Sequence, residues 1–189
     1  MNRKKKKVFV AMSGGVDSAV AAALLKKAGF SVVGIYMKCW TEGPSCTTQE
    51  DERSARLAAL HLKIPLYVWD FIDEYRQKVV EYMLEGYQKG ITPNPDIMCN
   101  REIKFGLFFE KAIELGADFV ATGHYARVKK TQTGYALLKG KDPEKDQSYF
   151  LAMISPEVLA KTLFPIGEYK KSQVRPFARN IRLPNAERK

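Results

Sequence analysis

Residues 8–18 read Val-Phe-Val-Ala-Met-Ser-Gly-Gly-Val-Asp-Ser, and this stretch decides the fold. The apolar run Val8–Ala11 is typical of a buried strand, and residues 18–28 carry the apolar spacing of a helix that stops before Gly29. The two glycines between them let a backbone approach a bound phosphate closely, and the helix offers free amides at its N-terminus. A strand, a glycine-rich turn and a helix in this order predict a phosphate-binding loop.

This glycine loop differs from the two commonest nucleotide-binding loops. No Gly-Lys-Ser/Thr follows the glycines, so the loop is not of the Walker A type, and it also lacks the spacing of the dinucleotide-binding motif. We interpret it as a loop that binds a nucleoside triphosphate without the Walker lysine. The alternative is a turn that holds no ligand, in which Asp17 or Ser18 caps the helix.

The rest of the chain alternates short β-rich runs with longer amphipathic stretches. We expect strands at 31–37, 66–69 and 118–122, and helices at 49–62, 72–89 and 100–115, with a loop at 38–48 and extended or turned chain at the proline-containing 91–98. This alternation predicts an α/β fold, a Rossmann-like parallel sheet with helices on both faces. Because ligands of such sheets bind at the carboxyl ends of the strands, the glycine loop, Met37 and Gly123–His124 should meet on one rim.

The pattern changes after His124. Residues 125–128 and 135–138 predict a β-hairpin, with Gly134 between them. Residues 139–147 are polar and should form a loop, and we expect helices at 148–155, 156–161 and 170–180. The whole chain, 1–189, is thus predicted to be one domain, with an α/β core at about 8–124 and a hairpin and helical extension at about 125–189.

Composition narrows the classes of protein and of partner. A net charge of +10 permits a polyanionic partner such as a nucleic acid. Three cysteines without a Cys-x-x-Cys pair predict neither a disulfide framework nor a structural zinc site, and they favour a reducing, cytoplasmic setting. The basic run Arg3–Lys7 and the apolar residues 8–12 after it imitate the start of a signal peptide. Ser13-Gly14-Gly15 and Asp17 interrupt the apolar run, so we expect no membrane segment.

Several motifs resemble known proteins. Ser-Gly-Gly-Val-Asp-Ser after an apolar strand resembles the PP-loop of the N-type ATP pyrophosphatases, of the adenine nucleotide alpha hydrolase type, which cleave ATP between its α- and β-phosphates. Residues 92–100 (TPNPDIMCN), 122–127 (TGHYAR), 145–151 (KDQSYFL) and 164–167 (FPIG) resemble the tRNA-specific 2-thiouridylase family. The resemblance runs from Val8 to about Lys189 and implies a sulfurtransferase that modifies tRNA. It would adenylate the C2 oxygen of the wobble uridine, release pyrophosphate and then replace AMP by sulfur derived from a persulfide.

The candidate thiol of this chemistry is Cys99. We expect it at the start of a helix, where the helix dipole lowers a thiol pKa, with Arg101 and Lys104 adding positive charge. The resemblance implies that Cys99 helps to release the sulfur and that Asn94, Pro95 and Asp96 contact the target base. Two alternatives stay open from the residues: a buried structural cysteine, and an iron–sulfur cluster with Asp96 and Cys99 as two of its ligands. Cys39 and Cys46 are taken as ordinary thiols.

The remaining site residues also follow from the resemblance. ATP, bound with Mg²⁺, would contact Ala11, Met12, Ser13, Gly14, Gly15, Val16, Asp17, Ser18, Met37 and Gly123, and tRNA would contact His124, Lys145, Asp146 and Gln147. From the bare sequence, Met37 could equally be a core residue, His124 a satisfied polar residue, and residues 145–147 a solvated turn. Asp17 is expected to orient the loop or to contact Mg²⁺, and we assign no protein-held metal.

The partners expected are tRNA and a persulfide sulfur donor or sulfur-relay protein. Members of the family are longer, with a small central domain, a C-terminal β-barrel and a second catalytic cysteine that bears the persulfide, all expected beyond Lys189. We therefore expect a truncated gene, a fragmentary record or half of a split enzyme, only partly competent by itself. The competing interpretations are another PP-loop adenylating enzyme of tRNA modification and a module that binds ATP or tRNA without turnover.

Overall fold

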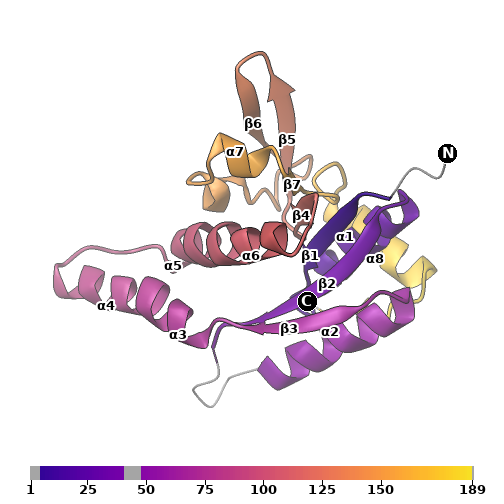
Figure 1. Cartoon of the computed structure of the whole chain (residues 1–189), viewed down its shortest axis with the longest axis horizontal. Helices are drawn as coiled ribbons and strands as arrows, with labels where there is room; N and C mark the ends of the chain where they lie inside the picture. Colours follow the sequence, from indigo (N-terminus) through magenta and orange to yellow (C-terminus); the bar gives the residue numbers. More distant parts are fainter. Residues whose placement is uncertain (1–4, 41–47, 189) are drawn as a thin grey trace.

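The computed structural model describes residues 5–40 and 48–188, and its centre is a parallel sheet (Figure 1). The strand order is β3-β2-β1-β4-β7, and every neighbouring pair is parallel. The strands are β1 (Lys7–Ala11), β2 (Ser31–Lys38), β3 (Leu66–Asp70), β4 (Phe119–Ala121) and β7 (Thr162–Leu163). The predicted parallel α/β sheet is confirmed. The two-residue strand β7 was not predicted, because its sequence is too short to show a period.

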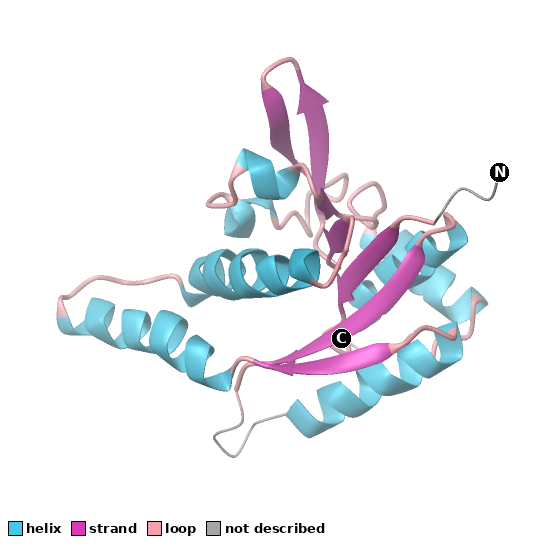
Figure 2. Ribbon diagram, viewed as in Figure 1, coloured by secondary structure: helices cyan, strands magenta, loops and turns pink. Residues whose placement is uncertain are grey.

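Helices cover both faces of this sheet, as Figure 2 shows. Alternate residues of β1 face opposite sides: Val8 and Val10 belong to one apolar cluster, and Phe9 and Ala11 to another. The first cluster includes residues of α1 (Val16–Lys27), α2 (Thr48–Leu62) and α8 (Lys171–Asn180). The second includes residues of two helical runs, one made of α3 (Ile72–Tyr75), η1 (Arg76–Val80) and α4 (Glu81–Gln88), the other of α5 (Pro95–Met98), η2 (Cys99–Leu107) and α6 (Phe108–Glu114).

The second helical run begins earlier than the sequence predicted. We expected extended or turned chain through Met98 and a helix from Asn100, but the helix starts at Pro95. Asn94 is its N-cap, because its side-chain Oδ1 accepts hydrogen bonds from the backbone N–H groups of Asp96 and Ile97 at 3.1 and 3.2 Å. Proline is well suited to the first helical position, where its missing N–H leaves no hydrogen bond unmade. The prediction for 95–98 was therefore wrong.

The segment after β4 forms a hairpin and short helices packed beside the sheet. Strands β5 (Ala126–Thr131) and β6 (Gly134–Lys139) pair in antiparallel fashion, which confirms the predicted hairpin, and they project away from the sheet in Figure 1. The expected helix at 148–155 is only the short 3₁₀ turn η3 (Ser148–Leu151), and α7 covers Pro156–Leu159. A third apolar cluster joins this region to the Cys99 helix, with Phe105 packing among Leu151, Leu159 and Phe164.

Among the described helices, none combines the length and the apolar character needed to cross a membrane.

Candidate nucleotide and thiol site

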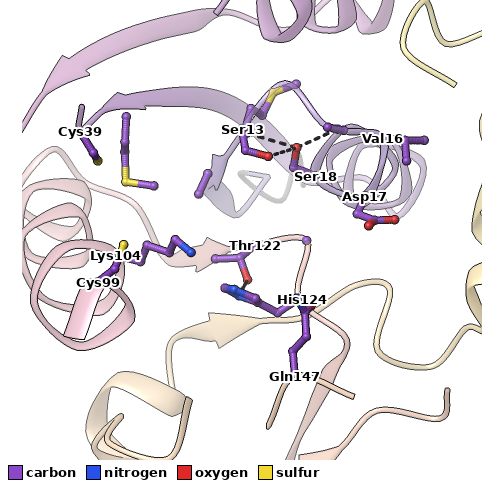
Figure 3. Close-up of a pocket in the computed structure, with 15 residues that line it drawn as sticks. Ser13, Val16, Asp17, Ser18, Cys39, Cys99, Lys104, Thr122, His124 and Gln147 are labelled. Atoms are coloured by element: carbon purple, nitrogen blue, oxygen red, sulfur yellow. Dashed lines mark hydrogen bonds between the residues drawn. The ribbon is translucent and has the colours of Figure 1, made fainter. Parts of the chain in front are cut away.

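A cavity of about 330 Å³ opens at the carboxyl ends of β1, β2 and β4 (Figure 3). The predicted meeting of the glycine loop, Met37 and Gly123–His124 on one rim is confirmed, because all three line this cavity. Cys99 lines it from the opposite, helical side. The complete lining is Ala11, Met12, Ser13, Gly15, Val16, Asp17, Ser18, Met37, Cys39, Cys99, Lys104, Thr122, Gly123, His124 and Gln147.

The glycine loop leaves the first amides of α1 without a side-chain cap. Gly15 is the N-cap residue, and no side chain hydrogen-bonds the amides that follow it. The Ser18 hydroxyl instead donates to the Gly15 carbonyl oxygen at 3.1 Å and accepts from the Ser13 N–H at 3.2 Å. The alternative in which Asp17 or Ser18 caps the helix is therefore wrong. Uncapped amides at a helix N-terminus are suited to hold an anion.

Contacts from behind fix the glycine loop. The Gly14 carbonyl oxygen accepts from the Ser54 hydroxyl at 2.7 Å and from Nδ2 of Asn185 at 2.9 Å. Gly14 has φ +86°, and a Cβ at this position would lie 2.3 Å from the Asp51 carbonyl oxygen. Gly15 lines the cavity and Gly14 does not. Gly14 therefore allows the loop to pack closely against α2 on the side away from the cavity.

Gly123 brings the end of β4 directly against the start of α1. A Cβ at Gly123 would lie 2.6 Å from the backbone nitrogen of Ser18. Such a distance is well below any normal contact, so only glycine permits this approach. The two elements that flank the cavity on this side are thereby held at a fixed separation.

Asp17 is engaged in an ion pair that the sequence did not predict. Lys171 Nζ lies 2.6 Å from each carboxylate oxygen of Asp17, and the Tyr125 hydroxyl donates to Oδ1 at 2.9 Å. Burial and the neighbouring Asp17 raise the pKa of Tyr125 well above its ordinary value. The Asp17–Lys171 pair ties α1 to α8, across 154 positions of sequence. No local pattern predicts a pair so distant in the chain.

Cys99 lies past the first turn of its helix rather than at the helix start. The helix begins at Pro95, so Cys99 is too deep in it for free N-terminal amides to act on the thiol. Burial raises the pKa of the Cys99 thiol, Lys104 opposes this rise, and Asp96 adds to it. The expected lowering of the Cys99 pKa was wrong. Arg101 does not supply the expected charge either, because its Nε lies 2.6 Å from Glu102.

Three lining residues were missing from the predicted site, namely Cys39, Lys104 and Thr122. Cys39 was interpreted as an ordinary thiol, yet it lies beside Met37 at the end of β2, so the rim argument could have included it. Burial, together with the nearby Cys99, raises the pKa of Cys39 to about 12, so it stays protonated. Cys46 lies outside the described residues.

The residues expected at the target base lie one turn before Cys99 but outside the cavity lining. The Asn94 side chain is occupied in capping, Pro95 is the first helical residue, and Asp96 is exposed. Their place on the Cys99 helix puts them close to the thiol along the chain. Asp96 is near enough to act electrostatically on Cys99.

The residues expected to contact tRNA divide between two cavities. His124 lines the first cavity, and its Nδ1 lies 2.7 Å from the Thr122 hydroxyl oxygen. Burial, aided by Lys104, lowers the pKa of His124 well below its ordinary value, so the imidazole is neutral at pH 7. Lys145 and Asp146 line a neighbouring cavity of about 540 Å³, and Gln147 lines both.

The parallel sheet and the glycine loop after β1 together define a Rossmann-like α/β fold of the PP-loop type. Among solved structures, a U34-tRNA thiolase, NcsA from Methanococcus maripaludis with its [4Fe-4S] cluster, matches with a TM-score of 0.64 and 20% identity over 96% of this chain and 59% of that one. A 4-thiouridine synthetase in a complex with RNA and bound ATP matches with a TM-score of 0.63 and 17% identity, over 97% of this chain and 42% of that one. At these identities the likeness concerns the fold.

The particular family follows from the sequence comparisons. Residues 6–189 match the family model described as the tRNA methyl transferase HUP domain, and the chain belongs to this family. A tRNA-specific 2-thiouridylase MnmA 1 of Geobacillus kaustophilus is 49% identical over 98% of the chain. A tRNA-specific 2-thiouridylase MnmA of Nitrosomonas europaea is 50% identical over 98%. The chain spans about half the length of these curated relatives, 51% and 52%.

Proposed function

We propose that this chain carries the ATP-activating and thiol-bearing site of a tRNA 2-thiouridylase. The uridine C2 oxygen attacks the α-phosphorus of ATP, and pyrophosphate leaves. The terminal sulfur of a persulfide then attacks C2, and AMP leaves with the former uridine oxygen. The base then carries both persulfide sulfurs, the outer one bonded to C2 and the inner one to the donor. The Cys99 thiolate attacks the inner sulfur and breaks the S–S bond, which leaves a thiocarbonyl on the base and a mixed disulfide between Cys99 and the donor.

One observation carries this proposal: the uncapped glycine loop and the Cys99 thiol line the same cavity. Activation requires a phosphate cradle, and sulfur release requires a thiol close to the activated carbon. The names of the curated relatives support thiolation. The description of the matching family speaks of methyl transfer, but methyl transfer from a methylated donor requires neither a phosphate cradle nor a thiol.

The cavity suggests how ATP would lie. Its β- and γ-phosphates would meet the free amides that follow Gly15, where the helix dipole favours negative charge. The adenine would extend toward Met37 at the end of β2, and Gly123 would lie close to the nucleotide. The α-phosphate would then face the helix that carries Cys99.

The tRNA side of the proposal rests on surfaces next to the cavity. Asn94, Pro95 and Asp96 would contact the target uridine, and His124 and residues 145–147 would contact the surrounding RNA. The net charge of +10 favours a polyanionic substrate. A persulfide donor completes the reaction, and a reducing cytoplasm would keep Cys99 available as a thiol.

The described residues do not fit a metal centre of their own. Asp17 is occupied by Lys171 and Tyr125, and the described part of the chain contains no group of three or more potential metal-ligating side chains. Mg²⁺ would therefore enter with the phosphates of ATP as part of the substrate. The iron–sulfur alternative names Asp96 and Cys99, two of the ligands that a cluster requires, and Cys39 lines the same cavity as Cys99.

The experiment that tests this function combines the chain with ATP, tRNA and a persulfide donor. We expect pyrophosphate, AMP and 2-thiouridine, and we expect Cys99→Ser to remove the thiouridine while ATP still binds. AMP and pyrophosphate without thiouridine from the unmodified chain would limit it to activation. Turnover of ATP and tRNA to a product other than 2-thiouridine, unchanged by Cys99→Ser, would favour another PP-loop adenylating enzyme. Binding without turnover would favour a binding module.

A further inference from the structure

Lys104 is the one cationic side chain among the described residues that line the first cavity. It lies on η2, five positions after Cys99, on the wall opposite the glycine loop. In Figure 3 its side chain leaves the helix and runs toward the middle of the cavity, on the side of Thr122. The amine therefore points into the space between the thiol and the carboxyl end of β4.

The charge of Lys104 has no counter-charge within the described part of the chain. Its nearest acid along the helix, Glu102, already pairs with Lys78 at 3.2 Å and with Arg101 at 2.6 Å. The carboxylate that lines the cavity, Asp17, pairs with Lys171 at 2.6 Å. The structure gives Lys104 neither a hydrogen bond nor an ion pair with any described residue, and the side chain is half-buried.

An unpaired cation in a half-buried position lowers stability unless a ligand compensates it. The Lys104 charge acts on three neighbouring side chains. It opposes the rise that burial causes in the pKa of Cys39 and of Cys99, and it adds to the lowering of the pKa of His124. The amine is thus central to the cavity. An anion bound there would interact with it directly.

The glycine loop, in turn, lacks the cation that a Walker A loop carries. The lysine of the Walker A motif has no counterpart in this loop. The wall formed by residues 13–18 presents backbone amides and hydroxyls but no positively charged side chain. We propose that Lys104 supplies the missing cation from the opposite wall and binds the α-phosphate of ATP and the phosphate of AMP. This inference rests on the proposed ATP site.

The choice of the α-phosphate follows from the geometry. The β- and γ-phosphates occupy the glycine loop in the proposed pose, so the phosphate nearest the Cys99 helix is the α-phosphate. Lys104 would there offset the negative charge that develops as the uridine oxygen attacks and pyrophosphate departs. The same contact would persist with AMP, which retains that phosphate, and would be absent with adenosine.

Equilibrium binding of ATP, AMP and adenosine to the 189-residue chain tests the inference. Lys104→Met should weaken ATP and AMP binding about 10- to 100-fold, the range for loss of a charge-assisted contact. Adenosine binding should change by less than about twofold, because it contacts no phosphate-binding group. Lys104→Arg should restore most of the affinity, since it keeps the charge.

Lys129→Met is the matched control, because Lys129 is an exposed lysine on β5, away from the cavity. It should leave all three affinities unchanged. If the unmodified chain binds ATP and Lys104→Met binds it equally well, the role of Lys104 is refuted and the ATP site stands. If adenosine affinity falls together with that of ATP, the lysine only shapes the pocket and the inference fails. If the unmodified chain does not bind ATP, the proposed function fails and this inference with it.

Discussion

The two walls of the cavity are built in opposite ways. The wall that holds the glycine loop consists of backbone, with amides, carbonyl oxygens and glycines at positions where a Cβ would collide with neighbouring backbone. The wall that holds Cys99 and Lys104 consists of side chains on a helix, with an N-cap at Asn94 and apolar residues beneath. Substitutions on the first wall should change the fold and ligand binding together. Substitutions on the second should change chemistry while the fold is retained.

Cys99→Ser should have the largest effect on activity and the smallest on the fold. We expect thiouridine formation to fall by about three orders of magnitude or more, because serine cannot accept the donor sulfur in a disulfide. ATP affinity should remain within about twofold. Thiouridine is measured by mass spectrometry of digested tRNA.

Cys39→Ser is the control within the same cavity. The raised pKa of Cys39, about 12, leaves almost no thiolate at neutral pH, so activity should fall far less than in Cys99→Ser. Equal losses in the two variants would contradict the distinct role given to Cys99.

Gly14→Ala should have the largest effect on the backbone wall. Alanine at φ +86° is strained, and its Cβ would meet the Asp51 carbonyl oxygen at 2.3 Å, so unfolding stability should fall by about 3 kcal/mol or more. ATP binding should weaken with it. Urea unfolding and ATP titration are the measurements.

Gly29→Ala is the control that separates the backbone strain of a positive φ from the steric collision of an added Cβ. Gly29 has φ +90°, and a Cβ placed on it would have no atom within 4 Å, so alanine there should cost about 1 kcal/mol and leave ATP binding intact. If Gly14→Ala costs no more than Gly29→Ala, the close packing behind the loop is not what fixes it.

Asn185→Ala tests the support of the glycine loop from the far end of the chain. Nδ2 of Asn185 donates to the carbonyl oxygens of Gly14 and Gly15, at 2.9 and 3.3 Å, in a buried setting. Its loss should lower stability by about 1–3 kcal/mol. Asn180→Ala, at an exposed helix end, should change stability by less than about 0.5 kcal/mol. Similar effects of the two variants in urea unfolding would show that the loop does not depend on Asn185.

The smallest effect expected is a shift in the pH dependence of thiol reactivity. Burial raises the pKa of Cys99 above the ordinary 9.0, so the thiolate fraction at neutral pH is lower than that of a free cysteine. In a chain with Cys39→Ser and Cys46→Ser, alkylation of Cys99 should still accelerate above pH 9.0. Adding Lys104→Met should move the curve to higher pH, whereas removing Asp96 should move it to lower pH. A curve centred below 9.0 would contradict the burial of this thiol.

The backbone wall could be predicted from sequence, and much of the side-chain wall could not. The run from Val8 to Ser18 fixes a strand, a turn and a helix locally, and the rim then follows from the rules of parallel sheets. Asn94-Pro95 carried a signal that went unused, because an N-cap residue followed by proline marks a helix start. This shift moved Cys99 away from the helix N-terminus, and burial raises the pKa of its thiol, where the sequence predicted a lowered one.

Other features depend on tertiary packing alone. The Asp17–Lys171 pair joins residues 154 positions apart, and the direction of the Lys104 side chain depends on how its helix packs against the sheet. Strand β7 has two residues and forms only because it can pair with β4. No window of sequence contains these determinants.

A structure of the chain with a non-hydrolysable ATP analogue tests the central claim most directly. Our account predicts the terminal phosphates on the amides that follow Gly15, the adenine beside Met37, and the α-phosphate between Lys104 and Cys99. A nucleotide bound instead in the neighbouring cavity beside Lys145 and Arg175, with the glycine loop empty, would contradict it.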